Sequence, residues 1–452
     1  MLAGLARDGG LYLPETWPQI PSDEMAEFAS MPYAHVAARV MRDFVAGDLE
    51  PGEFTRLVED AYETFDDPEV APLVQIGPQQ WICELFHGPT LAFKDIAMQL
   101  LAQLMDRALA RRGERITIVG ATSGDTGGAA VEAFAGREAI DIFILHPNGR
   151  VSDVQRRQMT GAAERNVHNI ALEGTFDDCQ ALVKALFNDH ALRDRLALAG
   201  VNSINWARIM AQIIYYFTSA ARLGAPDRAV GFAVPTGNFG DIFAGYAASR
   251  MGLPVSRLVI ATNENDILAR TLASGRYQPK GVIATTSPSM DIQVSSNFER
   301  LLFEVSGRSG ERVRSMMGEL GESGAIQLSG HELEGIQSLF AAHRIDQDEV
   351  ARTIKRLFQD QNYMADPHTA VGIAAAAREQ ADADAPMVIL GTAHPAKFPE
   401  AVKRACGAAP TVPERLEKRL RAEERYDVLG NDYATLAAYL SERSRALVEP
   451  QL

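Results

Sequence analysis

The sequence predicts an α/β fold with mainly parallel sheets, preceded by a helical N-terminal part. From residue 76 onward, short apolar runs alternate with segments of helical spacing, which is typical of parallel sheets covered by helices. Residues 1–75 show helical spacing instead, most clearly at 33–44 and 53–65. The 452 residues are enough for roughly two or three domains.

The expected strands are apolar runs that helical patterns mostly separate: 81–86, 116–120, 141–145, 167–172, 230–235, 257–262 and 387–392. In parallel α/β sheets, ligands bind at the carboxyl ends of strands, in the loops that lead into helices. Those loops are therefore where chemistry is expected. The charged stretch 303–365 is less regular and indicates a helical insertion, with its clearest helices at 335–345 and 348–359.

Composition and charge argue against several classes of function. A net charge of −15 argues against general nucleic-acid binding. Cys83, Cys179 and Cys406 form no CxxC pair, which indicates a reducing compartment and argues against a zinc site. No apolar run approaches the ~18 residues of a membrane span, and residues 1–15 lack the apolar core of a signal peptide. We expect a cytoplasmic protein with no metal, nucleic-acid or membrane partner.

Lys94 is the first residue with a predicted chemical role. It lies between the strand 81–86 and a helical stripe over 96–110, with Gly113 as the expected C-cap. The positive end of a helix dipole and burial both lower a lysine pKa and free the amine as a nucleophile. Such amines form Schiff bases, most often with pyridoxal phosphate. The alternative is a solvated lysine, which position alone favours.

The loop after 116–120 is suited to an anion. It carries Ser123, Gly124, Asp125 and Thr126 at a helix start, where exposed N–H and hydroxyl groups would bind a carboxylate or phosphate. The same residue types are good helix caps, so this loop alone leaves both interpretations open.

A glycine turn follows the strand 230–235. Gly237, Asn238, Phe239 and Gly240 enter a helix, and glycines allow backbone N–H groups to approach phosphate oxygens closely. Asp241 comes next, and its charge would repel a phosphate. We therefore expect its side chain to point elsewhere, bridging amides of the loop.

The loop 391–400 follows the last expected strand. Thr392 is placed to hydrogen-bond a heterocycle nitrogen, while His394 and Lys397 are alternatives for the chemistry. His394 is equally well explained as a structural residue of the loop, and Lys397 as a solvated lysine. Further polar residues either line a cavity or act as caps and turns: Arg208, Asn263, Ser287, Asp291, Ser296, Asn297 and Arg300.

Together these motifs resemble the threonine synthase family, whose members are pyridoxal-phosphate enzymes of the tryptophan-synthase-β-like fold. The resemblance runs from residue 2 to about 400, through LAGLARDGGLYLPE, HGPTLAFKD, SGDTG, NSINWARI, PTGNFGDIFAGY, TNENDIL, TTSPSMDIQVSSNFERL, DPHTAVG and TAHPAKF. HGPTLAFKD and SPSMDIQVSSNFERL are the most specific. The resemblance implies two mainly parallel-sheet α/β domains with the cofactor between them, plus a helical N-terminal part.

The resemblance also implies roles for individual residues. Lys94 would hold pyridoxal 5′-phosphate as an aldimine and move protons. The rest of the cofactor site would be Gly237, Asn238, Phe239, Gly240, Asp241 and Thr392. The substrate α-carboxylate would be bound by Ser123, Gly124, Asp125 and Thr126. The contact for the substrate phosphate stays open among Arg156, Arg208 and Arg300.

The implied reaction is the last step of threonine biosynthesis, by a carbon–oxygen lyase that is a monomer or homodimer. It converts O-phospho-L-homoserine and water to L-threonine and phosphate. One alternative is a related pyridoxal-phosphate lyase that eliminates phosphate and releases a 2-oxo acid. The other is a catalytically lapsed relative that only binds a ligand or partner.

The expected division of the chain follows the family. It has a helical N-terminal part (1–75), a large cofactor-binding domain (76–95 and 225–400, with the insertion 303–365), a small α/β domain (96–224) and a helical C-terminal extension (401–452). Family members usually carry further residues before LAGLA, including a Ser-Thr-Arg-Gly stretch. The resemblance therefore implies that the chain starts downstream of its true start or lacks a strand.

Overall fold

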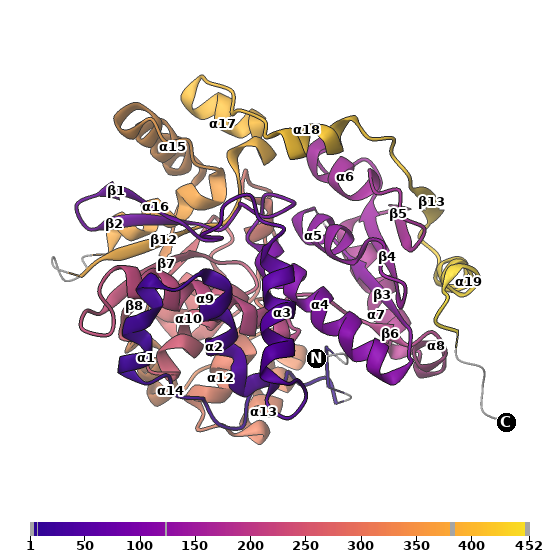
Figure 1. Ribbon diagram of the computed structural model, residues 1–452, viewed down its shortest axis with the longest axis horizontal. Helices are drawn as coiled ribbons and strands as arrows, with labels where there is room; N and C mark the ends of the chain where they lie inside the picture. The colour runs from indigo at the N-terminus through magenta and orange to yellow at the C-terminus, as the bar shows by residue number, and fades with distance from the viewer. Residues whose placement is uncertain (1–3, 7, 123, 380–384, 448–452) are drawn as a thin grey trace.

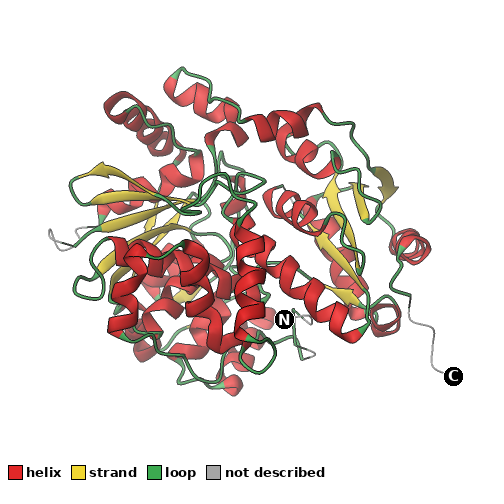
Figure 2. Cartoon of the chain, viewed as in Figure 1, coloured by secondary structure: helices red, strands yellow, loops and turns green. Residues whose placement is uncertain are grey.

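The computed structural model describes residues 4–6, 8–122, 124–379 and 385–447. It confirms the α/β fold class: two mainly parallel sheets lie side by side with helices around them, and a helical N-terminal part packs alongside (Figure 1; Figure 2). No helix in the described ranges is long and apolar enough to cross a membrane.

The larger sheet has six strands in the order β1-β2-β12-β7-β8-β11. Their bounds are Leu73–Gly77 (β1), Gln80–Glu84 (β2), Met387–Gly391 (β12), Val230–Pro235 (β7), Val255–Thr262 (β8) and Phe340–Arg344 (β11). Only β1 and β2 pair antiparallel. The strands β7 and β12 are buried throughout, as expected for a parallel sheet with both faces covered. The covering helices include α10 (Gly240–Arg250) and α16 (Pro367–Arg378).

The smaller sheet has five strands, all parallel, in the order β13-β5-β4-β3-β6. Their bounds are Asp427–Gly430 (β13), Val167–Glu173 (β5), Ile140–Pro147 (β4), Ile116–Ala121 (β3) and Leu198–Ala199 (β6). The helices of this part include α5 (Asp125–Phe134), α6 (Asp153–Thr160), α7 (Phe176–Asn188) and α8 (His190–Arg195).

The N-terminal part is helical, as predicted, with α1 (Ser22–Glu27), η1 (Phe28–Ser30), α2 (Tyr33–Val45) and α3 (Pro51–Tyr62). It packs against α4 (Lys94–Arg112) and α9 (Trp206–Arg222). Because α4 also contacts α5, most of its surface is buried. Lys94 is the first residue of α4, and Gly113 ends the helix in the left-handed region with φ of 66°, both as predicted.

The stretch 303–365 is not purely helical. It contains the end of α12 (Phe298–Val305), then α13 (Gly310–Ser323), β10 (Ile326–Gln327), α14 (Gly330–Gln337), β11 and α15 (Gln347–Gln361). The helix predicted over 335–345 is wrong beyond its first three residues, because α14 ends at Gln337 and β11 then occupies Phe340–Arg344 and pairs with β8. A short apolar run fits either structure, and the edge of the sheet decides between them. β10 pairs with β9 (Arg276–Tyr277), which follows α11 (Ile267–Ser274).

The C-terminal stretch is also not purely helical. After α17 (Pro399–Cys406), it crosses to the smaller sheet through α18 (Glu414–Arg421), β13 and α19 (Tyr433–Arg443), as the yellow end of the ribbon in Figure 1 shows. β13 was not predicted, and it adds an edge strand beside β5. Its sequence gives little signal because most of its residues are exposed.

Candidate active site

Residues from separate loops lie close together around Lys94. Lys94 Nζ donates a hydrogen bond of 3.3 Å to Ser289 Oγ and lies 3.6 Å from Asp125 Oδ2. The backbone N–H of Phe93 donates to the carbonyl oxygen of Thr392 at 2.9 Å. A Cβ added to Gly237 would lie 2.7 Å from the Ser289 carbonyl oxygen. The structure therefore brings together the turn before α4 and the loops that follow β3, β7 and β12.

The side chain of Lys94 is 11% exposed, and its ammonium group has few partners. Nζ lies 5.4 Å from the centre of the Phe93 ring. Burial lowers the pKa of Lys94, and the positive charges of Arg208 and Lys397 lower it further, while Asp125 opposes them. A lowered pKa increases the fraction of neutral amine, which is the form that attacks a carbonyl group.

Asp125 is a buried anion at the start of α5. Its Oδ1 accepts a hydrogen bond from Gln155 Nε2 at 3.0 Å and lies 3.1 Å from Lys397 Nζ. Its Oδ2 accepts from Ser289 Oγ at 3.2 Å. Burial alone would raise the pKa of this carboxyl, but the ammonium groups of Lys397 and Lys94 outweigh burial and hold it well below its usual range.

The rest of the first loop is closely packed around Asp125. Gly124 has φ of 154°, and a Cβ there would lie within 2.6 Å of Gln155 side-chain atoms. Thr126 is half-buried in the first turn of α5, whereas Ser123 lies outside the described residues. The loop thus presents one acidic side chain to two lysines. The N–H groups of Gly124 and Gly127 already donate to Thr122 Oγ1 at 3.0 Å, which leaves those of Asp125 and Thr126, among the described residues, as the donors for an anion.

The glycine turn leads into α10 with Phe239 in the left-handed region at φ of 64°. Asn297 holds this turn, since its backbone N–H and its Nδ2 both donate to the Asn238 carbonyl oxygen at 3.0 Å. A Cβ on Gly240 would lie 3.2 Å from Asn297 Nδ2. Together with the tight approach at Gly237, these contacts support glycine at both positions, with the first N–H groups of α10 lacking intrahelical acceptors.

Asp241 does not bridge amides of the loop. Its Oδ1 instead accepts hydrogen bonds from the hydroxyls of Tyr215 and Tyr216 on α9. Burial raises the pKa of Asp241 to about 7, and the two tyrosine hydroxyls only partly oppose this. The expectation that this side chain points away from the turn is correct, and the partner is an adjacent helix.

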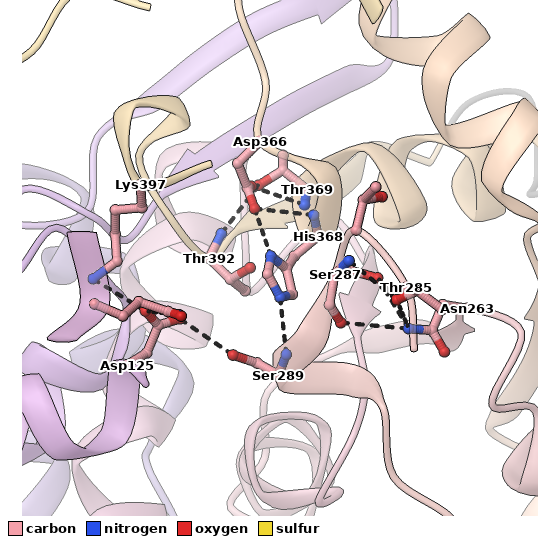
Figure 3. A network of polar contacts seen from close by, with 12 residues as sticks. Asp125, Asn263, Thr285, Ser287, Ser289, Asp366, His368, Thr369, Thr392 and Lys397 are labelled. Atoms are coloured by element: carbon pink, nitrogen blue, oxygen red, sulfur yellow. Dashed lines mark hydrogen bonds and ion pairs between the residues drawn. The ribbon is translucent and has the colours of Figure 1, made fainter. Parts of the chain in front are cut away.

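A buried carboxylate that the sequence argument did not single out connects two parts of the site. Asp366, at the start of α16, accepts from Thr369 Oγ1 at 2.5 Å and pairs with His368 Nδ1 at 2.7 Å. His368 Nε2 accepts from the Ser289 N–H at 3.2 Å, and Thr369 Oγ1 accepts from the Thr392 N–H at 3.2 Å. Figure 3 shows Asp366 between these two branches.

Lys397 is buried, so its interpretation as a solvated lysine is wrong. Its side chain is 0% exposed, and Figure 3 shows it directed at Asp125. It lies in η3 (Pro395–Lys397), directly after the loop of Thr392. His394 acts as a cap, because its Nδ1 accepts from the Ala396 N–H at 3.1 Å. Burial lowers the pKa of His394 to about 4.

The three arginines left open for the substrate phosphate differ in their partners. Arg156 pairs with Glu424 at 2.8 Å and with Asp153 at 2.7 Å. Arg300 donates to backbone carbonyl oxygens and to Asn297. Arg208 is buried on α9 and donates to the Val201 carbonyl oxygen at 3.3 Å, while its Nε has no partner among the residues that the structure describes. Among the described residues, Arg208 forms no ion pair with an acidic side chain.

The other polar residues singled out in the sequence mostly bind each other. Asn263 Nδ2 donates to Ser287 Oγ at 3.0 Å and to Asp291 Oδ1 at 2.8 Å. Ser296 Oγ donates to Asn238 Oδ1 at 3.4 Å, beside the glycine turn. These contacts support the alternative in which the residues stabilise loops. Within the described parts of the chain, no group of three His, Cys, Asp or Glu side chains is arranged to hold a metal ion.

Comparison with known proteins gives the family. A family model described as pyridoxal-phosphate dependent enzyme matches residues 71–392, and two others, threonine synthase N terminus and threonine synthase C-terminal, match 1–62 and 369–440. Threonine synthase of Pseudomonas aeruginosa is 51% identical over 98% of this chain and 94% of its own length. The chain belongs to the threonine synthase family.

Solved structures of threonine synthases agree with this assignment. The pyridoxal-phosphate-bound enzyme from Brucella melitensis superposes with a TM-score of 0.95 at 57% identity, over 98% of this chain and 95% of its own. The yeast threonine synthase superposes with a TM-score of 0.92 at 39% identity, over 97% of this chain and 94% of its own. The cofactor of this family is pyridoxal phosphate.

The residues of this threonine synthase family member fit that cofactor. Lys94 offers a buried amine with a lowered pKa, as covalent attachment of an aldehyde requires. The turn at Gly237 has no room for a side chain and leads into the positive end of α10, as a phosphate site requires. Both features contact the same residue, Ser289, so they lie on one site.

Sequence reasoning missed Ser289, His368, Asp366 and Gln155 in this threonine synthase family site. A signal existed for the first three, because Ser289 lies in the stretch 285–304 and the other two in the motif DPHTAVG. Gln155 lies in α6, outside any motif singled out, and only the fold brings it to Asp125.

Proposed function

We propose that this chain converts O-phospho-L-homoserine and water to L-threonine and phosphate, with Lys94 as the lysine that holds pyridoxal phosphate. One observation carries the proposal: the Lys94 amine is buried with a lowered pKa, beside both Asp125 and the Ser289 segment that contacts the glycine turn. A structural lysine has no need of a lowered pKa, whereas a nucleophile and base does.

The proposed binding residues follow from the contacts. The N–H groups of Gly237, Asn238, Phe239, Gly240 and Asp241 would hold the cofactor phosphate at the start of α10. Thr392, whose backbone is fixed by Thr369 and Phe93, would bring its hydroxyl to the pyridine nitrogen. The substrate α-carboxylate would lie in the loop of Ser123, Gly124, Asp125 and Thr126, bound by the hydroxyls of the loop and by the first N–H groups of α5.

Arg208 is proposed for the substrate phosphate. A buried guanidinium without a carboxylate partner is costly, because the hydrogen bond to the Val201 carbonyl oxygen does not replace the lost hydration of its charge. Burial lowers the pKa of Arg208 only to about 10, so it stays charged at neutral pH. A phosphate would supply the missing charge and bond the free Nε, and Arg–phosphate contacts are among the stronger hydrogen bonds.

The chain supplies proton transfer and positioning. Pyridoxal phosphate, when bound, withdraws electrons from the carbon next to the substrate nitrogen and so acidifies the protons on it. Lys94 Nζ, the proposed attachment point of the cofactor, is the proposed base, and its lowered pKa suits it both to take and to return a proton. Ser289 Oγ holds Nζ at 3.3 Å, and Asp125 offers the returning ammonium a counter-charge. Both therefore keep Nζ at one point between transfers.

Incubation with O-phospho-L-homoserine tests the proposal when threonine, phosphate and 2-oxo acids are all quantified. Equal amounts of threonine and phosphate are expected. Phosphate with a 2-oxo acid and no threonine would instead favour the eliminating lyase. Cofactor binding without any product would favour a relative that has lost catalysis, and Lys94→Ala serves as the blank in each assay.

A cytoplasmic monomer or homodimer completes the proposal. Cys83 and Cys179 are free thiols in the interior, which suits a reducing compartment. Light scattering of the purified chain, coupled to size-exclusion chromatography, distinguishes the two assembly states.

A further inference from the structure

The ammonium group of Lys397 is fully bonded. It donates to the Thr90 carbonyl oxygen and to Gln158 Oε1, both at 2.7 Å, and it lies 3.1 Å from Asp125 Oδ1. An ammonium has three hydrogens, so three acceptors satisfy it. The acceptors come from three segments: the turn before α4, helix α6 and the start of α5.

These partners are themselves tied to one another. Gln158 Nε2 donates to the same Thr90 carbonyl oxygen at 3.0 Å, and Gln155 Nε2 donates to Asp125 Oδ1 at 3.0 Å. The Thr90 N–H and hydroxyl both bind the Asp95 carboxylate at 2.7 Å. Because Asp95 follows Lys94 directly in α4, any movement of Thr90 is transmitted to the start of that helix.

Asp125 divides its oxygens between the two lysines. Oδ1 faces Lys397 and Gln155, whereas Oδ2 faces Ser289 and Lys94. When Lys94 gives up its proton, Lys397 is left as the cation on this carboxylate. Without Lys397, Asp125 would have Lys94 as its one ammonium partner among the described residues, and would hold Lys94 in the protonated form.

We propose that Lys397 is a positioning residue for Lys94: it neutralises Asp125 and fixes the turn at Thr90, which leaves the Lys94 amine free to react. This role rests on the proposed function of Lys94. The charged and titratable groups that face the pair from neighbouring elements are Asp95, Arg208, His368 and His394.

The test measures Lys94 itself, independently of threonine formation. Wild type, Lys397→Met and Lys397→Gln, each as the full chain freed of cofactor, receive trace isotope-labelled acetic anhydride between pH 6 and 11. Peptide mass spectrometry then gives the reactivity of Lys94 at each pH. The glutamine variant keeps donors for Thr90 and Asp125 while removing the charge, so it guards against misfolding of the methionine variant. Lys403→Met, at an exposed position of α17, is the matched control.

Removal of the Lys397 charge should raise the pKa of Lys94 by about one unit, because a like charge that lowers it is gone and the Asp125 carboxylate, an opposite charge able to shift a pKa by roughly 1–3 units, then acts on Lys94 without a competing ammonium. Lys403→Met should leave the titration unchanged. In the holoenzyme, the pH at which the cofactor absorbance changes should move in the same direction. An unchanged Lys94 titration in both Lys397 variants would overturn the proposal, whereas an inactive wild type with a shifted titration would count against the proposed reaction alone.

Discussion

Lys94 and Lys397 lie on opposite sides of one carboxylate, yet their surroundings differ in kind. Lys397 has acceptors for all three ammonium hydrogens and a side chain with 0% exposure. Lys94 has one hydroxyl at 3.3 Å, a carboxylate at 3.6 Å and an aromatic ring beside it, and burial lowers its pKa. Burial alone therefore does not mark a reactive lysine. What distinguishes the two is how completely the charged form is bonded.

The largest effect should come from Lys94→Ala, because this substitution removes the amine that we propose as the nucleophile and base. Threonine formation should fall by at least the 10²–10⁴-fold typical of general acid–base catalysis. Cofactor should still bind, without a covalent link, because the glycine turn remains. Lys94→Arg should not rescue activity, since a guanidinium stays protonated. Borohydride reduction with peptide mapping tests for the covalent link, and a threonine assay measures the loss of activity. A reduced adduct on Lys397 would mean that Lys397, and not Lys94, is the reactive lysine.

Asp125→Asn should show how much the ion pair between Asp125 and Lys397 contributes to the free energy of unfolding. It leaves a buried ammonium without a counter-charge, a change that typically costs about 3–5 kcal/mol of unfolding free energy. Asp125→Asn/Lys397→Met should recover much of this loss, because neither charge then remains unpaired. Urea unfolding of the two variants and wild type measures the difference. Equal stability of Asp125→Asn and Asp125→Asn/Lys397→Met would mean that the charges of Asp125 and Lys397 do not stabilise each other.

The difference in stability between wild type and Asp125→Asn should change with pH in one direction. The folded pKa of Asp125 is held far below its unfolded value of about 3.9. Its stabilising contribution is therefore complete above about pH 4 and is lost progressively as the pH falls below that value. The gap in unfolding midpoint between wild type and Asp125→Asn should be constant from pH 6 to 8 and narrow below pH 4. A gap that widens on acidification would contradict the ion pairs.

Sequence reasoning placed Lys94 correctly but misjudged Lys397, for a physical reason. The helix start at Lys94 is a local feature, visible in the apolar spacing of 96–110 and the strand before it. The burial of Lys397 depends on partners 307 and 239 residues away, at Thr90 and Gln158, which no local pattern reveals. The same holds for β11 and β13, whose pairing partners in the sheets decide their conformation.

A smaller effect is expected at the glycine turn that lies on the Lys94 side of the site. In Gly237→Val, Cβ would press on the Ser289 carbonyl oxygen at 2.7 Å, and backbone cannot easily move away. Gly240→Val meets the Asn297 amide at the longer distance of 3.2 Å, so a smaller displacement would relieve the contact. Cofactor affinity, measured by absorbance titration, should fall in both variants, and by about tenfold or more at Gly237. A larger loss in Gly240→Val would indicate that the phosphate site lies further along the turn.

The smallest effect on activity should follow His394→Asn, although His394 lies three residues from Lys397. Burial sets the pKa of His394 at about 4, so the ring is neutral throughout the range in which Lys94 works. Asparagine keeps an acceptor for the Ala396 N–H, so the lost cap should cost less than about 1 kcal/mol. The activity profile between pH 6.5 and 9 should match that of wild type.

The stability of the protein should also depend on His394 as the pH falls. An imidazole with a depressed folded pKa stabilises the protein above its unfolded value of about 6.5 and loses that contribution as the pH falls towards 4. Wild type should therefore lose stability relative to His394→Asn between pH 6.5 and 4, as thermal unfolding midpoints would show. A changed activity profile near neutral pH would give this histidine a role in proton transfer. The loop 391–400 would then contribute more to the reaction than the positioning role proposed for Lys397.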